Sequence, residues 1–147
     1  MKIVISADTL LGVAADIPAW VAALGHEVIL RGALDPQADA QWASCSAAAA
    51  TDVADGRADQ GIVCCTTGTG ASIAANKVAG VRAALCSDAF TAAGARKWND
   101  ANVLCVSLRL TSESVMKEML GAWFSARVDT AQAANIAYLT GLERPYG

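Results

Sequence analysis

The sequence predicts a three-layer α/β/α Rossmann-like fold with a five-stranded parallel sheet. Strand-like and helix-like segments alternate along the chain, which is typical of α/β proteins with right-handed crossovers. The five strand-like segments are continuous apolar runs, as expected for strands that are buried on both faces. Gly25 and Gly56 each follow a helical pattern, at a position where glycine commonly ends a helix.

The individual elements follow from the same patterns in chain order. The first strand is KIVIS, and the helical pattern VAADIPAWVAAL after it contains Pro18, either in its first turn or at a kink. Asp88 is expected to cap the helix DAFTAAGARKW, and Thr111 or Ser112 to cap the helix that follows the last strand. We expect strands over residues 2–6, 26–31, 61–65, 81–86 and 101–107, and helices over 13–24, 40–56, 70–80, 88–98, 111–126 and 130–139.

Length and composition indicate one globular domain, residues 1–147, with a single sizeable core. The net charge is −3 and no basic run occurs, which argues against nucleic-acid binding. No apolar run approaches the roughly 20 residues of a membrane span. The opening MKIVISAD is interrupted by Asp8 and does not read as a signal peptide, so we expect a cytoplasmic protein.

The cysteines and the histidine do not form a metal-binding pattern. None of the five cysteines belongs to a C-x-x-C pair, and the single histidine, His26, lies in a helix-to-strand turn. We therefore expect no metal site and no cofactor. Cys64, Cys86 and Cys105 lie in apolar strand-like runs and are expected to be small buried hydrophobic residues.

Several other residues are expected to serve the structure. Trp20, Trp42 and Trp123 occupy helical positions that are typical of a core. Asn76, one to two turns into its helix, is expected to make local hydrogen bonds.

Polar residues and glycines follow the expected strands at the points where the strands end. The carboxyl ends of parallel strands share one rim of the sheet, and ligands bind along that rim in open α/β folds. The rim is expected to bring together Asp8, the segment 65–70, Ser87 with Asp88, and the segment 107–109.

Cys65 is the distinctive residue of this rim, because it directly precedes a glycine loop. The helix that begins after Gly68 and Gly70 would direct free N–H groups at a ligand, and such donors stabilise an oxyanion. The positive end of that helix would also favour the thiolate of Cys65. The thiol is then either a nucleophile or a base that moves a proton beside a carbonyl. A tight turn with an inert cysteine stays open, because the loop lacks the third glycine of a dinucleotide motif and a Walker lysine.

The stretch CTTGTGASIAANKVAGVRAALCSD, followed by NDANVL, resembles the type B ribose-5-phosphate isomerases and their relatives. Those relatives include galactose-6-phosphate isomerase subunits and tetrulose-phosphate isomerases. The opening MKIVISAD and the segment LGHEVI also fit, so the likeness runs from Met1 to about Trp123. The resemblance implies an aldose–ketose isomerase that works through a cis-enediolate without a metal.

The resemblance also implies a role for each matching residue. Cys65 takes the position of the base that carries a proton between C1 and C2, and Thr67 that of a threonine that helps to place the substrate. Asp8 and Asn99 match residues that contact substrate hydroxyls, and Arg109 matches an arginine that helps to bind phosphate. The enediolate oxygen would be held by backbone N–H groups of Gly68, Thr69, Gly70, Ala71 and Ser72.

The chain departs from the family pattern at several positions. Thr9 replaces a histidine that helps to hold phosphate, and Trp98 replaces the histidine that opens the furanose ring. Ser87 replaces a further histidine, and Thr66 replaces the glycine after the base. The segment DTAQAANIAYL carries no arginine, although the family's C-terminal helix usually carries arginines that reach the phosphate in the dimer partner.

These departures bear on the substrate. Without a ring-opening group at position 98, a cyclic aldopentose phosphate would be handled poorly, whereas an acyclic four-carbon ketose phosphate needs no such step. Trp98 either narrows the pocket or packs at the end of its helix. The chain thus lacks several of the residues that bind phosphate in the family, and three explanations stay open. Arg96, Arg127 or Arg144 replaces the missing phosphate ligands, the substrate carries no phosphate, or the chain pairs with a different subunit.

The sequence thus predicts an aldose–ketose isomerase of a phosphosugar, nominally ribose 5-phosphate and ribulose 5-phosphate, with Cys65 as general base. A tetrulose phosphate or another atypical sugar is the alternative substrate, and a non-catalytic or partner-dependent subunit is the alternative function. Family members are dimers or tetramers with sites at the interface. We therefore expect a homodimer or homotetramer in which the helix at about 130–140 packs on the partner.

Overall fold

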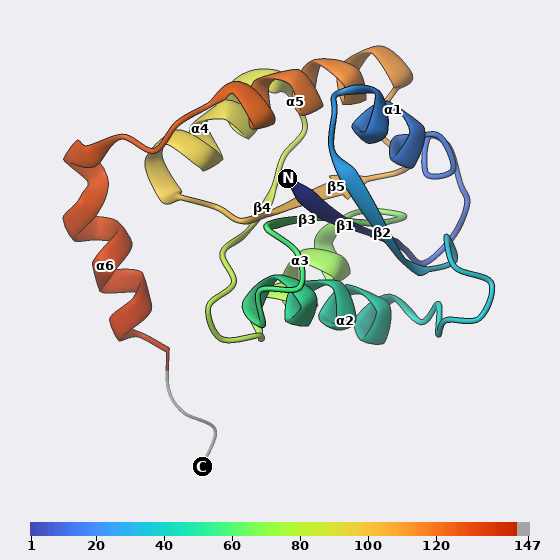
Figure 1. Ribbon diagram of the computed structural model, residues 1–147, viewed down its shortest axis with the longest axis horizontal. Helices are drawn as coiled ribbons and strands as arrows, with labels where there is room; N and C mark the ends of the chain where they lie inside the picture. The colour runs from blue at the N-terminus through green and yellow to red at the C-terminus, as the bar shows by residue number, and fades with distance from the viewer. Residues whose placement is uncertain (144–147) are drawn as a thin grey trace.

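The computed structural model describes residues 1–143, and these form a five-stranded parallel sheet between two layers of helices (Figure 1). The strands are β1 (Lys2–Ala7), β2 (Glu27–Gly32), β3 (Gln60–Cys65), β4 (Ala83–Leu85) and β5 (Val103–Ser107). Their order in the sheet is β2–β1–β3–β5–β4, and every neighbouring pair is parallel. The expected three-layer Rossmann-like fold is confirmed.

The helices divide between the two faces of the sheet (Figure 1). One face is covered by α1 (Ile17–Ala23), α4 (Ala89–Asn99) and α5 (Glu113–Ser125), and the other by α2 (Trp42–Ala54) and α3 (Thr69–Asn76). A 3₁₀ turn (Thr130–Gln132) and α6 (Ala133–Gly141) follow α5, and α6 extends away from the sheet.

Several boundaries differ from those expected, and the largest differences concern α1, α3 and β4. The first helix begins at Ile17, four residues late, because Pro18 occupies its first turn and residues before it form turns. The helix expected over 70–80 ends at Asn76, and the strand expected over 81–86 is shortened to β4. The side chain of Asn76 links the end of α3 to the start of β4. It accepts a hydrogen bond from the Ala83 N–H (2.9 Å) and donates one to the Ala83 carbonyl (2.9 Å). This is the local role expected for it.

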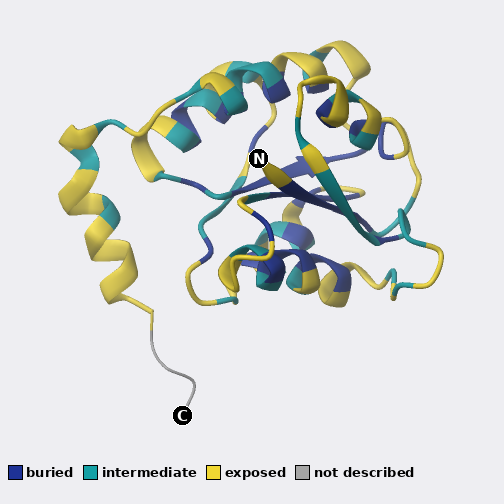
Figure 2. Ribbon diagram, viewed as in Figure 1, coloured by how far each residue is buried: buried dark blue, intermediate teal, exposed yellow. Residues whose placement is uncertain are grey.

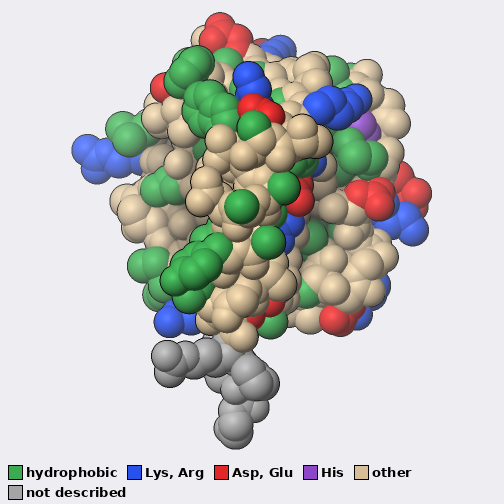
Figure 3. Space-filling model, turned by 90° about the vertical axis from the view of Figure 1, so that its left-hand side faces the viewer, with side chains coloured by type: hydrophobic (Ala, Val, Ile, Leu, Met, Phe, Trp, Pro, Cys, Tyr) green, Lys and Arg blue, Asp and Glu red, His purple; other side chains and the backbone are tan. Residues whose placement is uncertain are grey.

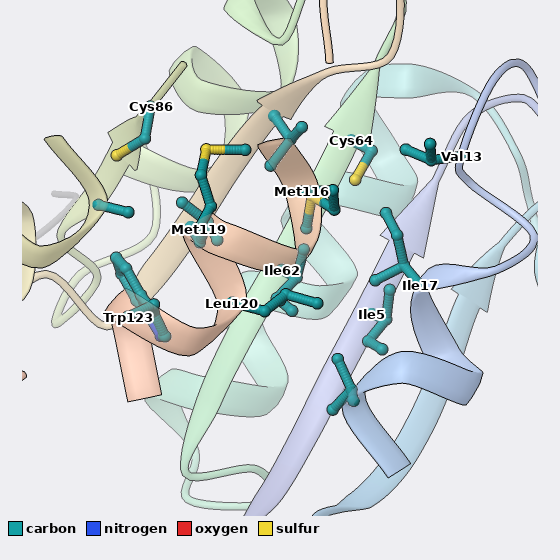
Figure 4. Close-up of a cluster of buried hydrophobic side chains, with 14 of the residues drawn as sticks. Ile5, Val13, Ile17, Ile62, Cys64, Cys86, Met116, Met119, Leu120 and Trp123 are labelled. Atoms are coloured by element: carbon teal, nitrogen blue, oxygen red, sulfur yellow. The ribbon is translucent and has the colours of Figure 1, made fainter. Parts of the chain in front are cut away.

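Large apolar side chains fill the space between the sheet and the layer of α1, α4 and α5 (Figure 4). Ile5 and Ile62 from the strands meet Met116 and Leu120 from α5 there, and each is at most 1% exposed. Trp123 closes this cluster, and its indole N–H donates to the Gln60 side chain at 2.8 Å. Burial of this much apolar surface is the main stabilising contribution to the fold.

The opposite layer is built from small residues. Ala49 and Ala50 of α2 and Ala71 and Ala75 of α3 are buried against Val4 and its neighbours in the sheet. Alanine lets a helix backbone approach the strands closely, so α2 and α3 hold the loops at their amino ends firmly over the sheet. Figure 2 shows the resulting pattern, with buried residues along the sheet and the inner helix faces.

The tryptophans do not all belong to the core. Trp123 is 1% exposed, as expected, and Trp20 is partly buried against the larger cluster. The expectation for Trp42 is wrong, because this side chain is 49% exposed. It is the first residue of α2, where the helix reaches the rim of the sheet rather than its middle.

The expected helix caps form. The Asp88 carboxylate accepts from the Thr91 N–H at 2.7 Å, and the Ser112 hydroxyl accepts from the Val115 N–H at 3.3 Å. His26 lies in the turn before β2 with its ring 4.3 Å from that of Phe124, which fits a structural role. Across residues 1–143, no helix is long and apolar enough to cross a membrane.

The backbone at Gly32 leads to a stability prediction. Gly32 has a left-handed φ of +64°, and a Cβ there would collide with the carbonyl oxygen of Ala7. Gly25 also has a positive φ, +89°, but no described atom lies within 4 Å of its Cβ position. Gly32→Ala should therefore lower the free energy of unfolding by about 3 kcal/mol or more, and Gly25→Ala by only about 1 kcal/mol. Urea denaturation checks this, and equal losses in the two variants would contradict it.

Candidate active site

The carboxyl ends of β1 and β3 lie side by side at the switch point of the sheet. At this point the strand order changes direction. The chain moves from β1 outward to β2 and then returns to the other side of β1 to form β3. Ligands bind at such switch points in open α/β sheets. Asp8 follows β1 here, and its N–H donates to the Cys64 carbonyl at 3.4 Å. Cys65, the last residue of β3, lies beside Ser107 of β5.

The loop after Cys65 is shaped by Gly68. This residue has a left-handed φ of +76° and is the N-cap of α3. A Cβ here would lie 2.9 Å from the Ser107 N and 2.5 Å from the Leu85 side chain, so the position admits only glycine without rearrangement. Within the described residues no side chain caps α3, which leaves the N–H groups of its first turn directed at the rim.

The thiol of Cys65 lies directly in front of this helix end. The Gly68 N–H donates to Cys65 Sγ at 3.1 Å, and the residue is 6% exposed. The end of β5 fixes the loop from the other side. Leu108 N–H donates to the Cys65 carbonyl and Arg109 N–H to the Thr66 carbonyl, both at 3.0 Å. A thiolate at this position would receive both a hydrogen bond and the favourable field of the helix dipole.

Two threonine hydroxyls stand at the open side of the loop. The Oγ1 atoms of Thr67 and Thr69 are 2.8 Å apart, and both side chains are exposed. The hydrogen bond between them orients the Thr67 hydroxyl next to the thiol loop. The pair therefore provides hydroxyl groups that can donate to or accept from a bound polar molecule.

Asp8 carries an oxygen without a partner. Its Oδ1 atom is buried and makes no hydrogen bond to any residue of the described chain. Desolvation raises the pKa of this carboxyl above its usual value. A buried acceptor of this kind is costly unless a ligand or water satisfies it, so Asp8 is suited to receive a hydroxyl group.

Arg109 is the cation of this rim. It follows β5, its side chain is exposed, and it forms no salt bridge with a carboxylate of residues 1–143. Arg96 is not a substitute, because Asp100 and the Ala101 carbonyl hold its guanidinium. Arg127 donates to carbonyls at the end of α5. Arg144, the third expected substitute, lies outside the described residues.

Asn99 is not brought to the thiol within one chain. It is the last residue of α4 and precedes the amino end of β5, whereas Cys65 lies at the carboxyl end of that strand. The two ends of a five-residue strand are roughly 13 Å apart. Trp98 packs along α4, with its ring against Gly94 and 5.7 Å from that of Phe90. Within one chain it therefore packs at the end of its helix and does not narrow the pocket at Cys65.

Trp42 is a rim residue that the sequence patterns missed. Its ring lies against Gly70, because a Cβ on Gly70 would be 2.8 Å from the Trp42 Cε3 atom. The only available sequence signal was its position at the start of a helix that follows a strand, since such helix starts lie at the carboxyl-end rim.

The other cysteines are poorly suited to chemistry. Burial raises the pKa of Cys105 to about 12 and that of Cys86 to about 11. Burial also raises the pKa of Cys64 and that of Cys45. All four are at most 2% exposed and all are free thiols. Among residues 1–143 no group of three His, Cys, Asp or Glu side chains is placed to hold a metal ion.

A separate groove lies on the α6 side of the molecule. It has a volume of about 710 Å³ and is lined by residues of the α3–β4 connection, by Asn99 and by Leu139 and Leu142 of the α6 region. Figure 3, which faces this side, shows hydrophobic side chains gathered on it. Every residue of α6 is at least partly exposed, and Tyr138 is 69% exposed.

A thiol in front of free backbone donors, at the switch point of a parallel sheet, is an arrangement suited to an α/β enzyme. The chain belongs to the Ribose/Galactose Isomerase family, which it matches over residues 3–138. This confirms the family that the sequence motifs indicated, and it is a family of isomerase enzymes.

Individual relatives support the assignment. The chain is 42% identical to a D-erythrulose-4-phosphate isomerase of Pectobacterium atrosepticum over 82 residues, which cover 56% of this chain and about half (54%) of that protein. It is 30% identical to a 4-deoxy-4-sulfo-D-erythrose isomerase of a Clostridium species over 142 residues, or 96% of this chain and 80% of that one. The solved structure of Clostridium thermocellum ribose-5-phosphate isomerase B superposes with a TM-score of 0.89 at 32% identity, covering all of both chains.

The environment of the thiols predicts selective alkylation. With iodoacetamide at neutral pH, Cys65 should react first, because the other four thiols are more deeply buried and have raised pKa values. Mass spectrometry of the peptide 58–77 measures this, and Cys65→Ala should remove the fast phase. Cys45→Ala is the matched control and should leave the fast phase unchanged. Fast labelling that persists in Cys65→Ala would contradict the prediction.

Proposed function

We propose that this protein is an aldose–ketose isomerase of a short phosphosugar, with Cys65 as the general base and a cis-enediolate as the intermediate. The observation that carries the proposal is the hydrogen bond from the Gly68 N–H to Cys65 Sγ, in front of the uncapped end of α3. A base and an oxyanion site then face the same bound carbonyl.

The chemistry follows from this arrangement. The Cys65 thiolate removes a proton from the carbon next to the substrate carbonyl, and the C–H electrons form the enediolate double bond. The negative charge that develops on the carbonyl oxygen is stabilised by the backbone N–H groups of Thr69, Gly70 and Ala71. The two ends of the expected set, Gly68 and Ser72, do not take part, because the Gly68 N–H donates to Cys65 Sγ at 3.1 Å and the Ser72 N–H to the Gly68 carbonyl at 3.0 Å. Cys65 then returns the proton to the neighbouring carbon, and one proton passes between the two oxygens. The substrate is thereby converted between aldose and ketose with no net change in atoms.

The remaining rim residues bind the substrate in this proposal. Asp8 accepts a substrate hydroxyl through its unpartnered oxygen, and Thr67, oriented by Thr69, contacts the sugar near the reacting carbons. Arg109 binds the terminal anion, which its unpaired guanidinium suits.

The nominal substrate pair is ribose 5-phosphate and ribulose 5-phosphate, supported by the likeness to ribose-5-phosphate isomerase B over the whole chain. A four-carbon sugar is the second candidate. Relatives named as isomerases of D-erythrulose 4-phosphate and of 4-deoxy-4-sulfo-D-erythrose support it. Trp98 also supports it, because this residue cannot act as a ring-opening acid or base and acyclic sugars need none.

We further propose a homodimer or homotetramer with the site at the interface. The exposed apolar residues of α6 favour a partner that covers this helix, and the distance between Asn99 and Cys65 within one chain favours a site completed by Asn99 of a second copy. The alternative, a non-catalytic or partner-dependent subunit, is favoured only by the small number of cations at the rim.

Hydrogen exchange tests the proposed reaction. The protein is incubated in D₂O with four- to six-carbon ketose phosphates, and deuterium at C1 is followed by NMR. Exchange should occur with at least one sugar and should fall by at least about 10²-fold in Cys65→Ala, the usual size of a general-base contribution. Cys45→Ala is the control. The absence of exchange with every sugar, alone or with a co-encoded relative, would exclude the isomerase.

Complementation tests the shared site. Cys65→Ala and Asn99→Ala should each be nearly inactive as homodimers, because each damages every site. Co-assembly of the two variants should restore about a quarter of the wild-type activity, since half of the dimers are mixed and each has one intact site. The parent variants, measured separately at the same concentration, are the controls. A mixture no more active than its parents would show that each chain builds its own site.

A further inference from the structure

We infer that Trp42 forms one wall of the substrate pocket and limits the length of the sugar that fits. This inference rests on the proposed isomerase function, and it concerns the first turn of α2. The contacts of this turn with the thiol loop and with the surroundings of Asp8 carry it.

The indole ring of Trp42 lies on the loop that follows the thiol. A Cβ on Gly70 would be 2.8 Å from Cε3 and 3.0 Å from Cζ3 of the ring, so the ring packs directly on the Gly70 backbone. Gly70 belongs to the first turn of α3, whose N–H groups face the ligand. Trp42 is 49% exposed, so much of this residue remains accessible to solvent.

The ring is held in place by the segment before it. One carboxylate oxygen of Asp39 accepts from the Gln41 N–H at 2.9 Å, and the other accepts from the Ser44 hydroxyl at 2.6 Å. These bonds keep the pKa of Asp39 below its usual value, so the carboxylate stays charged and bonded at neutral pH. The start of α2 is thus fixed on both sides of Trp42, which favours a preformed wall over a mobile flap.

The same turn of α2 extends toward Asp8. Cys45, one turn after Trp42, donates from its thiol to the Trp42 carbonyl at 3.8 Å and is 2% exposed. A Cβ on Gly32 would lie 3.1 Å from the Cys45 Cβ atom, and Gly32 pairs in the sheet with Ala7, the residue before Asp8. The buried Oδ1 of Asp8 has no partner in residues 1–143 and is an independent sign of a ligand at this place. In this proposal, a sugar that spans Cys65 and Asp8 lies along the first turn of α2 and its Trp42 ring.

The chemistry of this wall suits a short sugar chain. An indole face packs against the C–H bonds of a carbohydrate while the hydroxyls point to polar partners such as Asp8 and Thr67. The volume of the ring also removes the space into which a longer chain would extend on the Gly70 side. The sugar that gains most from Trp42 is then a four-carbon ketose with a terminal anion, and a five-carbon sugar gains less.

The test measures binding without turnover, in the Cys65→Ala background. Tryptophan fluorescence is titrated with D-erythrulose 4-phosphate and with D-ribulose 5-phosphate. Trp42→Phe should lose most of the ligand-dependent fluorescence change. The control Trp20→Phe should keep it, because Trp20 lies on α1, behind the sheet, against Lys117. Trp42→Ala should weaken binding of the four-carbon sugar about 3- to 10-fold, the size expected for an aromatic contact, and should weaken the five-carbon sugar less.

Several outcomes overturn the inference. Because Trp98 adjoins Asn99, the fluorescence comparison is made in a Trp98→Phe background. A fluorescence change that persists there in Trp42→Phe shows that the Trp42 ring does not face the ligand, and equal weakening of both sugars excludes a role in length selection. If deuterium exchange depends on Cys65 but the Trp42 variants bind as the parent does, the inference fails while the proposed function stands. If neither sugar binds and no sugar exchanges, both fail. Thermal unfolding of Trp42→Phe confirms that any effect comes from a folded protein.

Discussion

The hydrogen bond from the Gly68 N–H to the Cys65 thiol is the interaction around which the site is arranged. It forms because Gly68 adopts a left-handed backbone in a space too small for a side chain. This conformation turns the chain from β3 directly into α3, so that the thiol and the first N–H groups of the helix face the same point. The end of β5 then fixes the loop through its contacts with residues 65 and 66.

The two helical layers contribute to this geometry in different ways. The layer of α1, α4 and α5 packs large side chains such as Trp123 on the sheet and provides most of the apolar burial. The layer of α2 and α3 packs mainly alanines, which brings the helix backbones close to the strands. Because these helices lie so close, their amino ends place Trp42 and Gly70 in contact at the rim. The side of the molecule with the smaller residues therefore carries the proposed site.

Two groups at the rim lack a partner within the described residues. Asp8 has a buried oxygen without a partner, and Arg109 forms no salt bridge with any of the described residues. In the proposed function, a hydroxylated anion would satisfy both groups. On the opposite end of β5, Asn99 lies by the groove under α6, whose residues remain exposed. A second copy of the chain would cover this apolar surface and bring the two halves together.

The sequence by itself determined the order of strands and helices, the loop at Cys65 and the caps at Asp88 and Ser112, because these depend on neighbouring residues and on local backbone preferences. It also placed Asp8 and Arg109 at one rim, since parallel strands must end together. Only the tertiary structure decided that Trp42 lies at the rim and not in the core, that Arg96 is bound to Asp100, and that Asn99 is remote from Cys65. These outcomes depend on where each helix begins and on which distant groups it meets, and local patterns carry no information about either.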